Sequence, residues 1–211
     1  MIVVSFYTEN TIYEKEVEDL RTSCEILGIE HFIQPRKDLG CWEKNCAQKP
    51  LFLLECLETF DRPLLWVDAD GIILQKPTLE FKGFDLALYF NNRKTKHARN
   101  GTIYISPTQA AKRFMKLWYE TLQKINRSSK LTPDQPVMIS LLRKESLKIA
   151  DLPLEYTQVF DRDPLSLERA VILHFQASRT ARMPPLFWRH LRGRDLKAMR
   201  MGSSPYRFFR N

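Results

Sequence analysis

The most informative pattern of hydrophobic and polar positions is a run of four apolar residues, 64–67, that stops at Asp68 and Asp70. Such a run is typical of a strand buried on both faces of a sheet. In an open α/β sheet, ligands bind beyond the carboxyl ends of the strands, where these aspartates fall. Because residues i and i+2 of an extended chain point the same way, both carboxylates are expected to face one point. The alternative is a tight turn at Gly71, with residues 72–74 as the second arm of a hairpin.

Strand-like and helix-like patterns alternate before this run. The chain predicts a strand over 2–7, a helix over 12–27, a strand over 30–34, and a helix over 42–59 that Pro50 kinks or restarts. This β-α-β-α-β order is typical of a parallel sheet with helices on its faces. Later strands are predicted over 72–75, 85–90, 101–106, 148–150 and 171–175, a polar loop over 91–100, and helices over 108–124 and 133–143. The expected fold class is therefore α/β, with a mostly parallel mixed sheet flanked by helices.

Length and cysteine content narrow the class of protein. A chain of 211 residues suits one domain, or one domain with an appendage. No apolar run approaches the length of a membrane span, and no basic region precedes the first strand as in a signal peptide, which favours the cytoplasm. The four cysteines lack paired C-x-x-C spacing, so free thiols are expected rather than a zinc site.

The positive charge is concentrated at the carboxyl end. Residues 179–211 contain nine Lys or Arg and one acid, Asp195, so they account for the whole net charge of +8. We therefore expect a balanced domain over 1–178 and a basic, aromatic, helical appendage over 179–211. Residues 180–211 could lie on an anionic membrane surface, such as the inner face of a membrane. The alternative is that their aromatic side chains pack on the domain while the arginines face solvent.

Several short motifs follow one another in a fixed order along residues 1–180. They are Tyr7-Thr8 after the first strand, Asp68-Ala69-Asp70, residues 100–106 (NGTIYIS), Pro133-Asp134-Gln135, and residues 172–175 (ILHF). In this order they resemble the motifs of the GT-A class of nucleotide-sugar glycosyltransferases, and within it the retaining family 8 and its relatives. The resemblance implies a single GT-A-like (Rossmann-like) domain that transfers a sugar from a nucleotide-sugar donor.

The resemblance implies a metal site made by Asp68, Asp70 and His174. Carboxylate oxygens suit Mg²⁺ or Mn²⁺, and an added imidazole nitrogen favours Mn²⁺. A divalent ion would stabilise the charge that develops on a leaving diphosphate. The alternative for His174, which lies in an apolar strand, is a hydrogen-bonded histidine of the core.

The resemblance also assigns residues to the donor, most simply a UDP-sugar. Tyr7 and Thr8 are expected at the nucleotide, and Asn100, Asp134 and Gln135 at the donor sugar. A turn at Asn100 and a helix cap at Asp134 are the alternatives. The tryptophans Trp42, Trp66 and Trp118 are expected to serve packing rather than sugar binding.

Cations are expected beside the phosphates, first Arg179 and then Arg36, Arg99 and Lys49. The family often follows its histidine with Gly and then Lys-Pro-Trp, whereas this chain continues Phe-Gln-Ala-Ser before Arg179. Arg179 would take the place of that lysine. The alternative for Lys49 is a solvated helix face.

The function predicted from the sequence is a metal-dependent glycosyltransferase that retains the configuration of the transferred sugar. No catalytic base is named, because the leaving phosphate can serve, and the acceptor is a glycan, lipid or protein. One alternative is a phosphatase of the haloacid-dehalogenase type, which also places Asp-x-Asp after an apolar strand. Another is a non-catalytic module that binds RNA or a protein partner, although the local basic charge argues against specific nucleic-acid binding.

Overall fold

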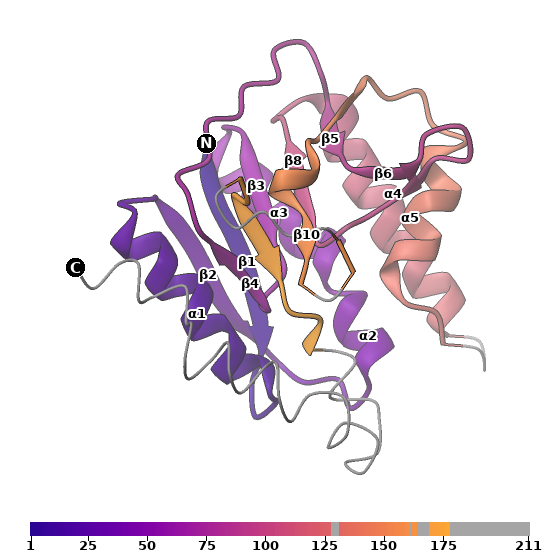
Figure 1. Cartoon of the computed structure of the whole chain (residues 1–211). Helices are drawn as coiled ribbons and strands as arrows, with labels where there is room; N and C mark the ends of the chain where they lie inside the picture. Colours follow the sequence, from indigo (N-terminus) through magenta and orange to yellow (C-terminus); the bar gives the residue numbers. More distant parts are fainter. Residues whose placement is uncertain (128–130, 161, 164–168, 178–211) are drawn as a thin grey trace.

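The computed structural model describes residues 1–127, 131–160, 162–163 and 169–177 (Figure 1). The helices are α1 (Tyr13–Ile26), α2 (Trp42–Cys46), α3 (Lys49–Phe60), α4 (Gln109–Asn126), α5 (Asp134–Leu142) and a 3-10 turn (Leu154–Tyr156). The strands of the largest sheet are β1 (Ile2–Thr8), β2 (His31–Arg36), β3 (Leu64–Val67), β5 (Leu86–Leu88), β8 (Thr102–Ile105) and β9 (Ile149–Asp151). The remaining strands are β4 (Gly71–Ile73), β6 (Phe90–Asn92), β7 (His97–Ala98), β10 (Gln158–Val159) and β11 (Ile172–His174).

The largest sheet has the order β2-β1-β3-β8-β5-β9. Its neighbours β2, β1 and β3 are parallel, β8 runs antiparallel to both β3 and β5, and β9 is parallel to β5. A smaller sheet has the order β10-β11-β4, and β6 pairs with β7 as a hairpin. The predicted α/β class with a mostly parallel mixed sheet is therefore confirmed.

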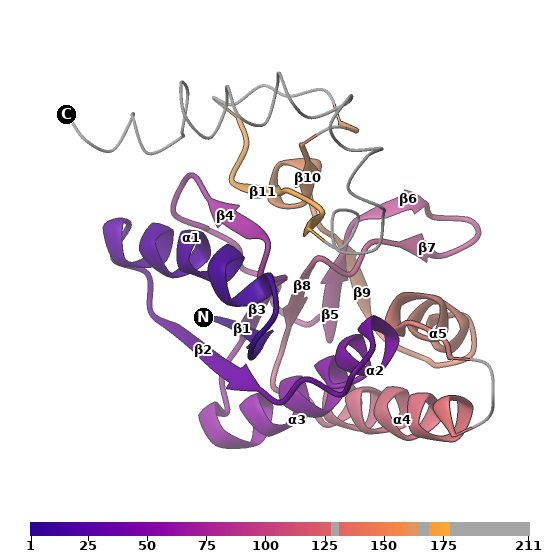
Figure 2. The same ribbon diagram turned by 90° about the horizontal axis from the view of Figure 1, so that it is seen from below.

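Two hydrophobic cores lie on the two faces of the large sheet (Figure 2). Successive residues of β3 alternate between them, since Leu64 packs with helices α3, α4 and α5 whereas Leu65 packs with α1. This alternation follows from the period of two in a strand, and burial on both faces explains why β3 is apolar throughout. On α4, Phe114 and Trp118 supply the apolar face that the sequence pattern predicts.

The helical segment expected over 42–59, with a kink or restart at Pro50, is two helices, α2 and α3, so the restart is confirmed. The break falls at Ala47 and Gln48, just before Pro50, which sits in the first turn of α3. Proline is tolerated there because the first helical N–H groups have no partner within the helix. The loop predicted over 91–100 differs, since it contains the β6–β7 hairpin.

The segment after β3 is a turn rather than a continued strand. The Gly71 amide donates to the Asp68 carbonyl oxygen at 2.8 Å, and the chain then enters β4. Strand β4 pairs with β11 rather than with β3, so a simple hairpin does not form. The expectation that Asp68 and Asp70 lie in an extended chain is therefore wrong, and the tight turn that the sequence offers as the alternative is confirmed.

Within the described part of the chain, no helix is long and apolar enough to cross a membrane. The appendage expected over 179–211 lies outside the described residues.

A buried serine fixes α1 against the small sheet. The Ser23 hydroxyl donates to the Leu20 carbonyl at 2.8 Å and accepts from the Ile73 amide at 3.1 Å. Ser23→Ala is expected to lower the free energy of unfolding by about 1–3 kcal/mol, because the buried Ile73 amide loses its partner. Urea denaturation measures this change. The matched variant Ser140→Ala, on an exposed position of α5, should shift it by less than about 0.5 kcal/mol, and equal effects would contradict the assignment.

Candidate active site

A pocket of about 420 Å³ opens beside the end of β3. Its lining includes ten of the residues that the sequence predicts for the site: Tyr7, Thr8, Lys49, Asp68, Asp70, Arg99, Asn100, Asp134, Gln135 and His174. These residues come from β1, α3, the β3–β4 turn, the segment before β8, the start of α5 and the end of β11. The fold therefore brings together side chains that are far apart in the sequence.

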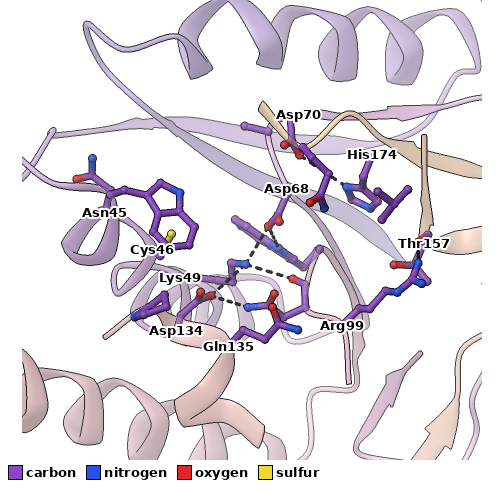
Figure 3. Close-up of a pocket in the computed structure, with 18 of the residues that line it drawn as sticks. Asn45, Cys46, Lys49, Asp68, Asp70, Arg99, Asp134, Gln135, Thr157 and His174 are labelled. Atoms are coloured by element: carbon purple, nitrogen blue, oxygen red, sulfur yellow. Dashed lines mark hydrogen bonds and ion pairs between the residues drawn. The ribbon is translucent and has the colours of Figure 1, made fainter. Parts of the chain in front are cut away.

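The centre of the pocket is the ammonium group of Lys49. Its Nζ lies 2.9 Å from Asp68 Oδ1 and 3.1 Å from Asp134 Oδ2, and it donates to the Asn100 carbonyl at 3.2 Å (Figure 3). Burial alone would lower the pKa of Lys49, but the carboxylates of Asp134 and Asp68 outweigh it and hold this pKa above its usual value. The Lys49 side chain is only 6% exposed, so the solvated helix face is wrong.

Two tryptophans of the core support this network from beneath. Trp66 Nε1 donates to Asp68 Oδ1 at 2.8 Å, and Trp118 Nε1 donates to the Asp134 carbonyl at 3.0 Å. Both rings are almost fully buried, as expected for packing, yet each indole N–H orients a residue of the pocket.

Residues expected at the donor sugar are held in place by further hydrogen bonds. Asn100 Nδ2 donates to Asp134 Oδ2 at 2.7 Å, and Gln135 Nε2 donates to the Ala98 carbonyl at 2.8 Å. Asp134 begins α5 but is not the cap residue, which is Pro133. Its carboxylate instead faces Lys49 and Asn100, so the helix-cap alternative is wrong.

On the other side of the pocket, Asp70 lies beside His174. Asp70 Oδ1 is 3.8 Å from His174 Nδ1, and Asp70 Oδ2 accepts from the Ala177 amide at 2.7 Å. His174 Nε2 shares a hydrogen bond of 2.8 Å with the Thr102 hydroxyl. His174 is thus hydrogen-bonded and 3% exposed, as a core histidine would be, and it also lines the pocket.

Two glycines leave room for the His174 ring. A Cβ atom built on Gly101 would lie 3.2 Å from His174 Cε1, and one built on Gly71 would lie 3.4 Å from the same atom. The Gly71 position also meets Val67 Cγ1 at 2.5 Å. The close approach of the imidazole therefore favours a glycine after Asn100, whereas after Asp70 it is the Val67 side chain that leaves no room for a Cβ atom.

The carboxylate oxygens of Asp68 and Asp70 and the imidazole nitrogen of His174 are atoms that commonly bind divalent metal ions. Asp70 Oδ1 and His174 Nδ1 are close enough for metal bonds of about 2.1 Å to reach one ion from both. Asp68 Oδ2 receives no hydrogen bond from the described residues, but the carboxylate is turned toward Lys49 and Trp66 (Figure 3). Accordingly, the described residues contain no group of three or more His, Cys, Asp or Glu side chains already gathered around one point.

Burial raises the pKa of Asp68, with a further contribution from the charge of Asp70 and opposition from Lys49. The Asp68 side chain is nevertheless 36% exposed toward the pocket, so a ligand can reach it. A cation arriving at this carboxylate would favour its charged form.

The arginines predicted beside the phosphates differ in their position relative to the pocket. Arg99 lines the pocket but is closed in a two-bond pair with Asp163, at 2.5 and 2.8 Å, and also donates to the Thr157 carbonyl. Arg36 pairs with Glu55 and is not part of the pocket lining, so its assignment to the phosphates is wrong. Arg179 lies outside the described residues.

Comparison with known proteins adds the decisive observation. The family model described as nucleotide-diphospho-sugar transferase matches residues 30–180, which is more than half of the chain. The chain belongs to this family. It is a glycosyltransferase that takes its sugar from a nucleotide-diphospho-sugar, which displaces the phosphatase and binding-module alternatives. No curated protein matches the sequence.

Solved structures agree with the fold of this transferase. A glycosyltransferase involved in glycosylation of the major capsid of PBCV-1 has a TM-score of 0.66 at 14% identity, over 85% of this chain and 96% of that one. The galactosyltransferase LgtC, crystallised with donor and acceptor sugar analogues, has a TM-score of 0.52 at 12% identity, over 90% and 99%. GlyE of Streptococcus pneumoniae TIGR4 has a TM-score of 0.57 at 13% identity, and the match covers 82% of this chain but 54% of GlyE.

The sequence reasoning missed part of the pocket of the transferase. The lining also contains Tyr13, Trp42 and Arg162, which the sequence reasoning did not assign to the site. Burial and the charge of Asp70 raise the pKa of Tyr13, so its hydroxyl stays protonated. No local motif marks these residues, because each reaches the pocket from a different loop or helix start.

The Arg99–Asp163 pair leads to a prediction about stability. Burial works to raise the pKa of Asp163, but the hydrogen bond from Arg99 holds it below its usual value. Both side chains are 9% exposed. Asp163→Asn is therefore expected to lower the free energy of unfolding at pH 7 by about 2 kcal/mol or more, because the Arg99 guanidinium loses its counter-charge.

The pH dependence of this loss has a definite sign. Because the pKa of Asp163 is lower in the folded protein than in the unfolded chain, its carboxylate stabilises the fold at pH values above the unfolded pKa of about 3.9. This stabilisation is lost as the pH falls through the pKa of the folded protein. The difference between wild type and Asp163→Asn should thus shrink below about pH 4, as urea denaturation across pH would show. The control Asp151→Asn removes an exposed partner of Arg93 and should change stability by less than about 0.5 kcal/mol. A difference that persists at low pH would contradict the assignment.

Proposed function

We propose that the protein is a metal-dependent, retaining glycosyltransferase whose donor is a UDP-sugar. The observation that supports this most is the shared lining of one pocket by Asp68, Asp70 and His174 together with Asn100, Asp134 and Gln135. The first three have the ligand types of a metal centre, and the last three are amide and carboxylate groups suited to sugar hydroxyls. Family membership supplies the nucleotide-diphospho-sugar as donor class.

In this proposal Asp68, Asp70 and His174 hold Mn²⁺ or Mg²⁺. Such an ion, when bound, neutralises charge on the diphosphate as the bond to the sugar breaks. Arg162, which is exposed and lines the pocket, can contact the same phosphates, and Arg179 is a second candidate from the sequence. Tyr7 and Thr8, with Tyr13 and Trp42 of the same pocket lining, are the residues that we assign to the base and ribose.

The contacts of Asp134 support a retaining course in this proposal. Its Oδ2 is paired with Lys49 and accepts from Asn100, so this carboxylate is poorly placed to attack the sugar or to accept a proton. The proton of the acceptor hydroxyl then passes to an oxygen of the leaving diphosphate. The bond from the sugar carbon to the phosphate oxygen breaks, and the bond to the acceptor oxygen forms on the same face. Asp134 instead stabilises positive charge on the sugar carbon.

Titration calorimetry of UDP with and without Mn²⁺ tests the donor and the metal. We expect wild-type protein to bind UDP more tightly in the presence of Mn²⁺, and Asp70→Asn to lose that Mn²⁺-dependent increase, because one metal ligand is gone. The control Asp61→Asn removes an exposed carboxylate that pairs with Lys112 and should behave as wild type. Identical binding by wild type and Asp70→Asn would contradict the proposed metal centre.

We also propose that residues 180–211 bring the enzyme to an anionic membrane surface, where a lipid acceptor or a glycan or protein acceptor near the membrane would be reached. The support is compositional: arginines alternate with aromatic and aliphatic residues, and the segment carries the net positive charge. This would place a cytoplasmic protein on the inner face of a membrane.

Sedimentation with liposomes that contain phosphatidylserine tests the membrane proposal. The full chain should pellet with the liposomes at low salt and be released at high salt, because the attraction is electrostatic. Protein that lacks residues 180–211 should stay in the supernatant, as should both proteins with uncharged liposomes. Equal recovery of the two proteins in the supernatant would contradict it.

A further inference from the structure

We propose that Lys49 is the internal counter-ion of the metal centre, which sets the affinity of the site for a divalent cation by competing for Asp68. This inference rests on the metal centre under Proposed function and assigns a role to a residue that is not a metal ligand. It makes Lys49 a positioning and charge-balancing residue rather than a solvated cation or a simple phosphate contact.

The geometry supports competition between the ammonium and a metal ion. Lys49 Nζ and Trp66 Nε1 both bond to Asp68 Oδ1, at 2.9 and 2.8 Å, and this turns the Asp68 carboxylate away from Asp70 and His174 (Figure 3). A metal ion bound by Asp70 and His174 must either bind the Asp68 carboxylate together with Lys49 or displace the Lys49 ammonium from it. The ammonium is held from its other side by Asp134, so it has a second carboxylate when Asp68 turns.

The charges of the network support the same role. Asp68, Asp70 and Asp134 would carry three negative charges, and Lys49 carries one positive charge, so the cluster has a net charge of −2. One divalent ion cancels this charge. Arg99 does not change this net charge, because its guanidinium forms an ion pair with the Asp163 carboxylate. Arg162 lines the pocket as well, and no described contact joins it to the three carboxylates.

The affinity for Mn²⁺ is expected to change in opposite directions when Lys49 and Asp134, the two charged residues of the network that are not proposed metal ligands, are neutralised. Lys49→Met leaves Asp68 free of its competitor, so the affinity for Mn²⁺ alone should rise by roughly tenfold or more. Asp134→Asn leaves Lys49 with Asp68 as its only carboxylate, so the affinity for Mn²⁺ should fall by roughly tenfold. The double variant Lys49→Met/Asp134→Asn restores the net charge and should bind Mn²⁺ within about threefold of wild type.

The measurement uses the full chain and Mn²⁺ without nucleotide. Electron paramagnetic resonance of free Mn²⁺ and titration calorimetry give the dissociation constant, and circular dichroism confirms that each variant is folded. Lys49→Arg, which keeps the charge, should stay within about threefold of wild type. The matched control Lys112→Met removes a lysine that pairs with exposed Asp61, outside the pocket lining, and should not change Mn²⁺ affinity.

Each outcome decides between the possibilities. A folded Lys49→Met variant that binds Mn²⁺ no more tightly than wild type overturns the inference. Changes of Mn²⁺ affinity in the same direction in Lys49→Met and Asp134→Asn also overturn it, because a merely structural role would produce them. If Lys49→Met does not fold, weaker binding by Asp134→Asn that the double variant restores supports the inference, and unchanged binding by Asp134→Asn overturns it. Wild-type protein that binds no Mn²⁺ would contradict the proposed metal centre itself, and the inference would fall with it.

Discussion

The ammonium group of Lys49 is the interaction on which the pocket depends, because it lies between carboxylates from two parts of the fold and pairs with both. Asp68 follows β3 in the sheet, whereas Asp134 begins α5, which lies among the helices on one face. Two carboxylates brought into a pocket repel each other unless a cation lies between them. A single buried lysine therefore allows the end of the sheet and the start of α5 to form one wall.

The direction of β8 explains why the other residues of the site gather at the same place. Because β8 runs antiparallel to β3, its first residues lie beside the last residues of β3, and Val67 pairs with Thr102. The segment just before β8 thereby brings Asn100 to the carboxyl end of β3, and the Asp68 amide donates to the Gly101 carbonyl at 2.8 Å. The site thus lies where the parallel part of the sheet meets its antiparallel strand, at the edge where open α/β sheets bind ligands.

Much of the fold and of the candidate site could be predicted, because the deciding patterns are local. An apolar run at residues 64–67 identifies a strand buried on both faces, and the periodicity of residues 108–124 identifies α4. The order of the short motifs pointed to the transferase family and to several of the residues that line the pocket. The restart at Pro50 and the tight turn before Gly71 were also within reach of the sequence, but the hairpin expected after that turn does not form, since β4 pairs with β11 from a distant part of the chain.

By itself the sequence determined the α/β class, the succession of strands and helices, and the residue types gathered around Asp68, because periodicity and motif order are properties of the chain. Only the tertiary structure decided the partners of those residues. Lys49 pairs with Asp134, Arg99 with Asp163, and His174 with Thr102, and the two members of each pair are 64 to 85 residues apart in the chain. Whether a charged side chain faces solvent, a ligand or a buried counter-charge depends on which elements pack against it, and no local pattern carries that information.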